Sequence, residues 1–393
     1  MSWFLVMDVV FYGSSLNYDQ GSGNYQELKK ITRWDGRQYT LVSRYALRYS
    51  LLETGRKLGL WDVAEGEKLH RAGSGDNTVI QPATDLLLTG EILLYPEFDL
   101  FGYLITSTTP QNFRNAPAKL SHAVSLTPFN YDALFNANLG MANRMRKIHG
   151  EMKPNPFTAE EHETFYIYSL VVDVDEVGKL DIFITLGSEV TLGRDENGKE
   201  IKMKVEDVLV ENNRVKFILK DKKNTKELLQ SNRVVLEDFK NINNKLVHIR
   251  YSLTPEEKKE RIKLLIESIL NLKRSIKGRE EDLRPRLLVL GLYRNSPYQT
   301  FKDRIQLLDE YSEEEYDEIE EREENEKKIV RIKHVISKSR KPVFKIAPLP
   351  KDISVAELDE SEIPSAIENL FQNEEKLSEV KVFKDPSIEI RLK

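Results

Sequence analysis

The sequence predicts an α+β fold of the ferredoxin-like or RRM-like type, with large insertions in the sheet. Three observations support this: an apolar strand over Phe4 to Tyr12, a helix opened by a capping box at Thr254, and a buried strand over Arg286 to Tyr293. A second helix and further strands between them give the order strand, helix, strands, helix, strand. With 393 residues, 40% of them hydrophobic, the chain is long enough to bury a substantial core.

The first strand leads into a loop rich in glycine and asparagine, residues 13–24. Such a loop permits positive φ angles and can turn backbone N–H groups toward an anion. A helix then starts after Ser43, whose hydroxyl is a good N-cap. Arg44 and Arg48 are four residues apart and share one face, while Leu47 and Leu51 share another that can anchor the helix to a sheet.

The middle of the chain alternates between clear and unclear patterns. Residues 91–105 read as a strand-rich piece, and 165–174 give the clearest strand of the sequence. Between them, 127–164 shows little regular pattern, and a segment of this length inside an ordered domain indicates a functional loop or disorder.

The C-terminal third begins with the helix opened by Thr254-Pro255-Glu256-Glu257, which we expect to end in Lys273, Arg274 and Lys277 before Gly278. After residue 300 we expect an acidic linker or helix over 301–334, followed by a C-terminal segment over 335–393 that adds strands.

Charge is strongly segregated although the net charge is only −5. Between Asp309 and Glu326 there are 12 acidic residues and one basic residue, and this balance of −11 leaves the rest of the chain at +6. Between Leu28 and Lys57 there are eight basic and two acidic residues. Because phosphate binding depends on the local field, such a chain can bind RNA despite its acidic overall charge.

Several classes of chemistry have no support in the sequence. The chain has no cysteine, which excludes disulfides and favours a reducing cytoplasm. Its six histidines never fall three or four residues apart, and no phosphate-binding loop or nucleophile elbow is present. The N-terminus reads as a buried strand and not as a signal peptide, and no apolar run approaches the roughly 20 residues of a membrane span. We therefore expect a soluble, cytoplasmic, non-enzymatic protein without cofactor or metal.

Three blocks of the sequence carry a resemblance to a known family. The first block contains Ser15-Leu16-Asn17-Tyr18, Gly21-x-Gly23-Asn24, Leu28-Lys29-Lys30-Ile31-Thr32, Asp35-Gly36-Arg37-Gln38-Tyr39-Thr40 and Ser43-Arg44-x-Ala46-Leu47-Arg48-Tyr49. The second contains Arg114-Asn115-Ala116-Pro117 and Ser121-x-Ala123-Val124-Ser125-Leu126, and the third Glu163-x-Phe165-Tyr166 and Val172-Asp173-Val174-Asp175-x-Val177-Gly178. These blocks, scattered over about residues 1–298, resemble the CRISPR-associated protein seven family, most closely its DevR branch, the backbone subunit of type I-B Cascade complexes.

The resemblance implies an RRM-like palm over residues 1–300, with a finger-like insertion at about 59–110 and a thumb-like loop at about 127–164. It implies a helical filament of identical subunits along the CRISPR RNA, next to other Cascade subunits, with target DNA pairing to the exposed guide in antiviral defence. The candidate RNA-binding residues are Asn17, Ser22, Lys29, Lys30, Arg33, Arg37, Ser43, Arg44, Arg48, Arg114 and Lys119. The sequence departs from the family pattern at Tyr45, where relatives often have glutamine, and in the acidic run after Asp309.

The chemistry of these residues agrees with binding that ignores base identity. Arginine forks bind phosphate oxygens in pairs, and contacts to phosphate and sugar leave the bases free to pair with a target. On the thumb-like loop, Met141, Arg144, Met145 and Lys147 are candidates for wedging between bases. The two methionines could equally belong to the core.

Two other functions remain open from the sequence. One is a type III-like subunit that cuts target RNA, with Asp19 or Asp35 as the catalytic acid. The other is a general RNA-binding module on an RRM-like sheet, which would need exposed aromatic side chains such as Tyr166 and Tyr168.

Overall fold

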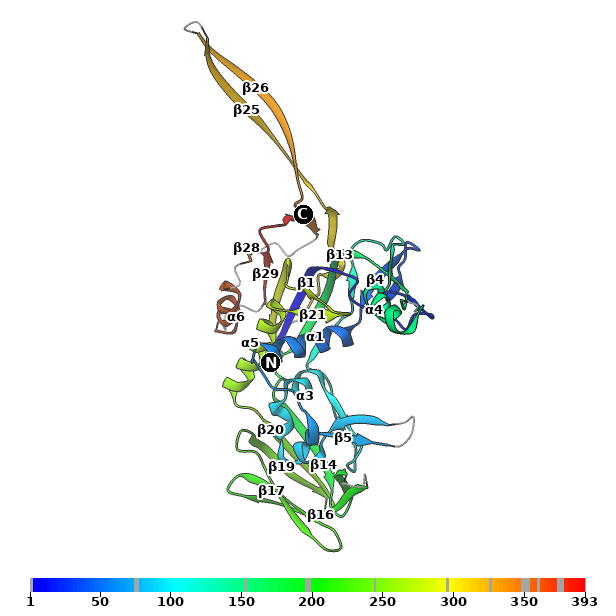
Figure 1. Ribbon diagram of the computed structural model, residues 1–393. Helices are drawn as coiled ribbons and strands as arrows, with labels where there is room; N and C mark the ends of the chain where they lie inside the picture. Colours follow the sequence, from blue (N-terminus) through cyan, green and yellow to red (C-terminus); the bar gives the residue numbers. More distant parts are fainter. Residues whose placement is uncertain are drawn as a thin grey trace. The chain divides into compact units, whose positions relative to one another are not determined.

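The computed structural model describes residues 3–73, 78–151, 154–194, 199–243, 245–294, 297–324, 327–347, 354–358, 361–372 and 378–392. The protein is a mixed α/β structure with many strands and few helices (Figure 1). It divides into two compact units, each made of three stretches of chain. Unit 1 comprises residues 1–5, 48–120 and 170–273, and unit 2 comprises 6–47, 121–169 and 274–393.

The main sheet lies largely in unit 2. Its strand order is β28 (Ser354–Glu357), β29 (Ser378–Lys384), β23 (Leu287–Arg294), β1 (Trp3–Ser14), β13 (Glu163–Asp173), β10 (Ala123–Ser125), β4 (Gln38–Val42) and β3 (Lys30–Thr32). In unit 1, the end of β13 also pairs with β9 (Ala118–Leu120), with Leu170 opposite Leu120. The three strands predicted at 4–12, 165–174 and 286–293 are confirmed as β1, β13 and β23, whose side chains are almost all buried, as befits strands covered on both faces.

The first helix, α1 (Arg44–Lys57), begins where the sequence predicts. The Ser43 hydroxyl accepts a hydrogen bond from the backbone N–H of Ala46 at 3.2 Å, as expected of an N-cap. Leu47 and Leu51 are each 2% exposed, so the apolar face of the helix is buried.

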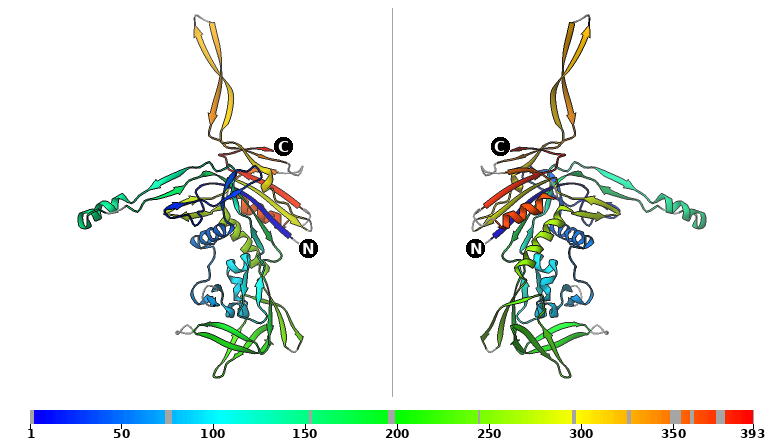
Figure 2. Two further views of the ribbon diagram at one scale, coloured as in Figure 1. Left: turned by 90° about the vertical axis from the view of Figure 1, so that its right-hand side faces the viewer. Right: turned by 90° about the vertical axis from the view of Figure 1, so that its left-hand side faces the viewer.

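Residues 127–164, expected to be irregular, contain regular structure. β11 (Ala133–Asn136) pairs with β12 (Phe157–Glu160), which pairs in parallel with β2 (Tyr25–Gln26), and α4 (Leu139–His149) connects β11 to β12. We call β11, α4 and β12 the arm; α4 lies at its far end (Figure 2). The strand pattern escaped prediction because β11 and β12 are only four residues long and many of their side chains are exposed.

Several further strands of unit 2 are short. They are β22 (Arg279–Asp282), β24 (Ile305–Asp309), β27 (Val343–Ile346) and β30 (Glu389–Leu392), together with the 3₁₀ turn η4 (Lys302–Arg304) and the helix α6 (Glu362–Gln372). The last three of these strands form one sheet in the order β24, β27, β30.

Most of the acidic run, expected to be a linker or helix, forms a β-strand over residues 312–324. β25 (Ser312–Glu324) pairs over its full length with β26 (Lys327–Ser339), and the two form a long ribbon (Figure 1). The register places Glu318 opposite Lys333 and Glu320 opposite Arg331. Opposite charges across the ribbon favour pairing, which a helix built from the acidic run alone could not obtain.

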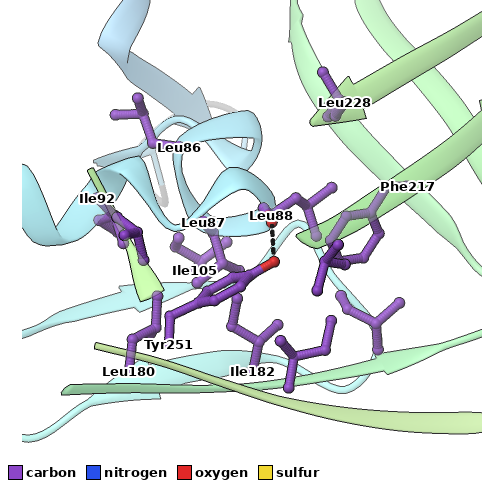
Figure 3. Close-up of a cluster of buried hydrophobic side chains, with 14 of the residues drawn as sticks. Leu86, Leu87, Leu88, Ile92, Ile105, Leu180, Ile182, Phe217, Leu228 and Tyr251 are labelled. Atoms are coloured by element: carbon purple, nitrogen blue, oxygen red, sulfur yellow. Dashed lines mark hydrogen bonds between the residues drawn. The ribbon is translucent and has the colours of Figure 1, made fainter. Parts of the chain in front are cut away.

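Unit 1 contains two larger sheets and several small elements. One sheet has the order β14 (Lys179–Thr185), β20 (Leu246–Ser252), β19 (Val235–Asn243), and the other the order β15 (Glu189–Arg194), β16 (Glu200–Glu211), β17 (Arg214–Lys220), β18 (Thr225–Leu229). The small elements are η1 (Gly66–Lys68), the hairpins β5 (Leu69–Ala72)/β6 (Val79–Pro82) and β7 (Tyr103–Ile105)/β8 (Asn112–Arg114), and α2 (Thr84–Thr89). A buried cluster joins these sheets to α2, and within it the Tyr251 hydroxyl donates to the backbone O of Leu88 at 3.2 Å (Figure 3).

The prediction of a strand-rich piece over 91–105 is wrong for most of its length. The segment forms a 3₁₀ turn, η3 (Glu91–Leu94), and a short helix, α3 (Pro96–Phe101), before β7 begins at Tyr103. Pro96 occupies the first turn of α3, and Gly90 and Gly102, at φ +76° and +74°, bound the two helical turns. The buried leucines and phenylalanine therefore reflect a buried helix, which an apolar run alone does not distinguish from a strand.

The helix α5 (Pro255–Leu270) has the predicted capping box but ends earlier than expected. Thr254 Oγ accepts from the N–H of Glu257, and the Glu257 carboxylate accepts from the N–H of Thr254, each at 3.2 Å. Asn271 caps the C-terminus of the helix. The basic residues expected in its last turn lie instead in β21 (Lys273–Ile276) and in the turn at Lys277. β21 pairs with β22.

Candidate nucleic-acid interface

The turn before α1 is built by the N-terminal loop. Asn17 Oδ1 accepts a hydrogen bond from the Ser43 N–H at 2.9 Å, and the Asn17 backbone O accepts from the Lys29 N–H at 2.8 Å. Together with the Ser43 cap on Ala46, these bonds fix the start of α1 and hence the position of Arg44. The side-chain oxygens of Asn17 and Ser43, both predicted RNA contacts, thus accept hydrogen bonds from the protein's own backbone.

Three predicted RNA-binding cations form ion pairs. Lys29 lies 3.3 Å from an oxygen of Asp19, and Arg37 lies 2.8 Å from Asp35; Arg37 is 61% exposed. Lys30 is more enclosed, because its ammonium lies 2.7 Å from Glu160 and 4.8 Å from the centre of the Phe129 ring. These carboxylates already neutralise much of the charge that would attract a phosphate.

Two other cations, Arg33 and Arg44, are exposed and lie against aromatic rings. The Arg33 guanidinium is 5.0 Å from the centre of the Tyr39 ring, and that of Arg44 is 5.0 Å from the centre of the Tyr45 ring. Arg44 also donates to the Tyr45 hydroxyl at 3.1 Å. Within the described chain neither guanidinium forms an ion pair with a carboxylate, so both charges are available to an anion.

Two further predicted RNA contacts, Arg48 and Ser22, are each only partly available to a ligand. Arg48 is half-buried in unit 1, with its guanidinium 5.8 Å from the centre of the Phe101 ring. Ser22 is exposed in a tight turn, where its N–H and O bond the O and N–H of Tyr25, each at 3.0 Å. Gly21 and Gly23 on either side have φ angles of +65° and +57°, as the glycine-rich sequence predicts.

Arg114 and Lys119 lie in unit 1, where Arg114 forms an ion pair with Asp99. The Arg114 side chain is 8% exposed; its guanidinium lies 2.7 Å from the fully buried carboxylate of Asp99 and donates to the backbone O of Glu176 at 2.7 Å. Its bonding capacity is thus largely used internally. Lys119 is exposed on β9.

The four candidate thumb residues lie on α4. Asn138 caps this helix by accepting from the Met141 N–H at 3.1 Å. Met141 is 56% and Met145 37% exposed, so these methionines are not core residues of the chain. Arg144 and Lys147 are also exposed, which gives the end of the arm both apolar and basic side chains.

The residues on which the alternative functions depend are engaged elsewhere. Asp35 accepts hydrogen bonds from the Arg37 side chain and the Tyr39 hydroxyl, each at 2.8 Å. Hydrogen bonds from the Gln20 N–H and Lys29 lower the pKa of Asp19. Tyr166 and Tyr168 are each 1% exposed, so they cannot stack on bases, contrary to the requirement of a general RNA-binding sheet.

The sequence analysis overlooked several exposed aromatic and aliphatic side chains. Trp34 is 93% exposed in the turn before β4, and Tyr131, just before the arm, and Phe135 and Ile148, on the arm, are each more than 70% exposed. A signal was present, because Trp34 stands among the basic residues of 28–57 and the others lie in the segment predicted to be functional.

The described ranges contain neither a metal-binding cluster nor a membrane-spanning helix. No group of three or more histidine, aspartate or glutamate side chains is arranged to hold a metal ion there. No helix in those ranges is both long enough and apolar enough to cross a membrane.

The fold is that of a mixed α/β protein, and its sequence places it among the CRISPR-associated proteins. Residues 5–316 match the family described as "CRISPR-associated negative auto-regulator DevR/Csa2", and the chain belongs to that family. The resemblance to the DevR branch is thereby confirmed, and the match ends within β25.

The solved structures that match the chain are distant from it in sequence. A "CRISPR RNA-guided surveillance complex, pre-nicking" matches with 10% identity and a TM-score of 0.40, over 77% of this chain and 81% of that chain. A "CRISPR RNA-guided surveillance complex" matches with 11% identity and a TM-score of 0.35, over 77% and 73%. A "Type IV-B CRISPR Complex" matches with 13% identity and a TM-score of 0.25, over 44% and 72%. No curated protein matches the chain.

Proposed function

We propose that the chain is a non-catalytic subunit of a CRISPR surveillance complex of the Cascade type. Copies of it pack side by side along the CRISPR RNA in the cytoplasm, hold the sugar-phosphate backbone, and leave the bases free to pair with target DNA. The family to which the chain belongs supports the CRISPR part of this proposal. The contact surface follows from the residues themselves.

The observation that carries the proposal is a pair of exposed arginines, Arg33 in the turn between β3 and β4 and Arg44 at the start of α1. Arg33 and Arg44 each lie against a tyrosine ring, which limits the motion of the guanidinium without neutralising its charge. A fixed planar donor with no carboxylate partner in the described chain suits a phosphodiester group. Contacts of this kind read no base and therefore fit a protein that must hold any guide.

Three features of the structure support the remaining parts of the proposal. The order β23, β1, β13, β9, with helices α1 and α5 in the connections, is the arrangement expected of a ferredoxin-like palm. The arm ends in exposed Met141 and Met145, side chains that suit a thumb inserted between base steps. The engagement of Asp35 by Arg37 and Tyr39 supports a structural role for this acid and a non-catalytic subunit.

Charge reversal on α1 tests the proposal. We expect Arg44→Glu together with Arg48→Glu to reduce the CRISPR RNA that copurifies with the assembled complex, whatever the guide sequence, because phosphate contacts are lost. The control is Lys222→Glu with Lys223→Glu, which makes the same change in net charge on an exposed turn between β17 and β18. RNA retention at the wild-type level in the folded α1 variant would refute the contact surface.

A cleavage assay tests the non-catalytic part. We expect the assembled complex, incubated with guide-matched RNA and a divalent metal ion, to leave that RNA intact. Regularly spaced cuts that disappear on Asp19→Ala or Asp35→Ala would instead establish the type III-like function.

A further inference from the structure

A basic residue from far along the chain, Lys302, lies close to the start of α1. The ammonium of Lys302, in η4, donates to the backbone O of His122 at 2.8 Å and to Ser121 Oγ at 3.2 Å. His122 Nδ1 in turn accepts a hydrogen bond from the backbone N–H of Arg44 at 3.0 Å. Lys302 is thereby connected to Arg44 through one residue, although 258 positions separate them in the sequence.

The position of Lys302 is fixed by the core of unit 2. The preceding residue, Phe301, is fully buried, and its N–H donates to Oδ2 of the buried Asp8 at 2.6 Å. Asp8 Oδ1 accepts from the Ser169 hydroxyl at 2.5 Å, and the Ser169 N–H bonds Ser121 Oγ at 2.9 Å. Because these bonds tie the segment around Lys302 to the central strands, the ammonium is pre-organised and is not a mobile surface charge.

The second ring nitrogen of His122 adds a donor to this group. Since Nδ1 accepts from Arg44, the neutral ring carries its proton on Nε2. The ring is exposed, and Nε2 has no hydrogen-bond partner in the described part of the chain. His122 therefore presents an N–H donor beside the first turn of α1, and its backbone O accepts from Lys302.

The electrostatics of the group favour an anion. Burial lowers the pKa of Lys302, and the positive charge of Arg33 lowers it further, while Asp303 and Asp8 act in the opposite direction. Burial likewise lowers the pKa of His122, with contributions from Arg44 and Lys302. The cations Arg33 and Arg44 of the N-terminal basic segment thus repel Lys302, and within the described residues Lys302 forms no ion pair with a carboxylate, Asp303 included. A bound anion would relieve this repulsion.

We propose that Lys302 and His122 Nε2, together with Arg44, bind one phosphodiester group of the CRISPR RNA. The inference rests on the proposed function and deepens it by adding two residues from outside the N-terminal basic segment. It also separates the cations that meet RNA from Lys29, Lys30 and Arg37, whose charges are paired with carboxylates.

The salt dependence of RNA binding tests this site. The probe is a 40-nucleotide single-stranded RNA of mixed sequence, titrated with the full-length protein at several salt concentrations. We expect Lys302→Gln to weaken binding by roughly three- to tenfold and to reduce the slope of log K against log salt by about 0.7, the value for one lost phosphate contact on a single strand. Lys302→Arg keeps the charge and should keep the wild-type slope. Lys223→Gln, an exposed lysine in unit 1, is the matched control and should also leave the slope unchanged.

Two further arms complete the test. Ultraviolet crosslinking of the wild-type protein to the same RNA, read by mass spectrometry, should place crosslinks on His122 or on residues 301–302, which requires no variant to fold. Inorganic phosphate, substituted for chloride at constant ionic strength, should not displace the RNA at concentrations of a few millimolar; displacement would assign the group to a small anion and overturn the proposal.

The failure of the inference is distinguishable from that of the proposed function. Steep, salt-dependent RNA binding by the wild type, with an unchanged slope in folded Lys302→Gln and no crosslink at His122 or 301–302, would refute this site alone. A wild-type protein that binds no RNA would refute both.

Discussion

The ammonium of Lys30 donates to both carboxylate oxygens of Glu160, each at 2.7 Å, across 130 positions of sequence. Glu160 is 3% exposed and also accepts from the Leu28 N–H at 2.8 Å and from the Tyr25 hydroxyl at 3.1 Å. One carboxylate at the end of β12 thus joins the arm to β2, to β3 and to the segment between them. Lys30 was predicted from the sequence to contact RNA, and that role stays a prediction; its structural role is to hold the base of the arm.

Loss of Glu160 should therefore destabilise the protein. We expect Glu160→Gln to lower the free energy of unfolding by about 2 to 4 kcal/mol, because it leaves the ammonium of Lys30 largely buried without a counter-charge. The double variant with Lys30→Met should recover part of this loss. Urea denaturation followed by circular dichroism measures both, and equal stability of wild type and Glu160→Gln would contradict the assigned role.

The buried pair of Arg114 and Asp99 leads to a second prediction. Asp99 is fully buried and binds Arg114, the Gly178 N–H at 2.8 Å and, at 3.4 Å, Arg261. We expect Arg114→Gln to cost about 3 kcal/mol of stability, since it removes one partner of a buried pair. RNA affinity of the folded fraction should be unchanged. A variant with wild-type stability and weakened RNA binding would restore Arg114 as an RNA contact.

The buried Asp8 should make stability depend on pH. Burial raises its pKa from 3.8 to about 6, against the lowering effects of Ser169, the Phe301 N–H and Lys302. An acid with a raised pKa binds its proton more tightly when folded, so its contribution to the free energy of unfolding falls as pH rises from about 4 through 6. Between pH 4 and 7.5 the wild type should lose about 2 to 3 kcal/mol relative to Asp8→Asn, which lacks this titration. Parallel stability curves of the two proteins would show that Asp8 is already ionised at low pH.

The sequence predicts those elements whose signal is local. The capping box at Thr254, the cap at Ser43 and the apolar runs of β1, β13 and β23 each need only neighbouring residues to be recognised, and each is found. The ribbon β25–β26 could not be read this way, because the charges that stabilise the acidic strand come from a partner strand.

The same distinction applies to the candidate site. Composition identifies the basic segment 28–57, but it does not reveal that Glu160 pairs with Lys30 while Arg33 and Arg44 stay unpaired in the described chain. Nor does it reveal that Lys302 lies beside Arg44, since that depends on the pairing of distant strands. Which cation is available to a ligand is thus decided by tertiary contacts.

The charged ribbon should be dispensable for the fold. Ser312 and Ser339 face each other at its base, with their hydroxyls 2.9 Å apart, and most described side chains beyond them are exposed. We expect replacement of residues 313–338 by an Asn-Gly turn to leave the melting temperature of the rest unchanged within a few degrees, because little apolar surface is uncovered. A collapse in melting temperature would instead reveal packing of the ribbon against the rest of unit 2.

Changes at the methionines of α4 should affect RNA binding without affecting stability. Met141 and Met145 are exposed, so Met141→Gln with Met145→Gln should change the free energy of unfolding by no more than about 0.5 kcal/mol, as surface substitutions do. If the arm inserts between bases, the same variant should alter the stacking of the bound RNA, since amide side chains do not replace an apolar wedge. Fluorescence of 2-aminopurine placed at successive guide positions measures this, and Lys222→Gln with Lys223→Gln, an exposed pair in unit 1, serves as the control. Insertion would be supported if wild-type complexes show a periodic pattern of bright positions and only the methionine variant loses it. Identical patterns in all three proteins would mean that α4 binds elsewhere.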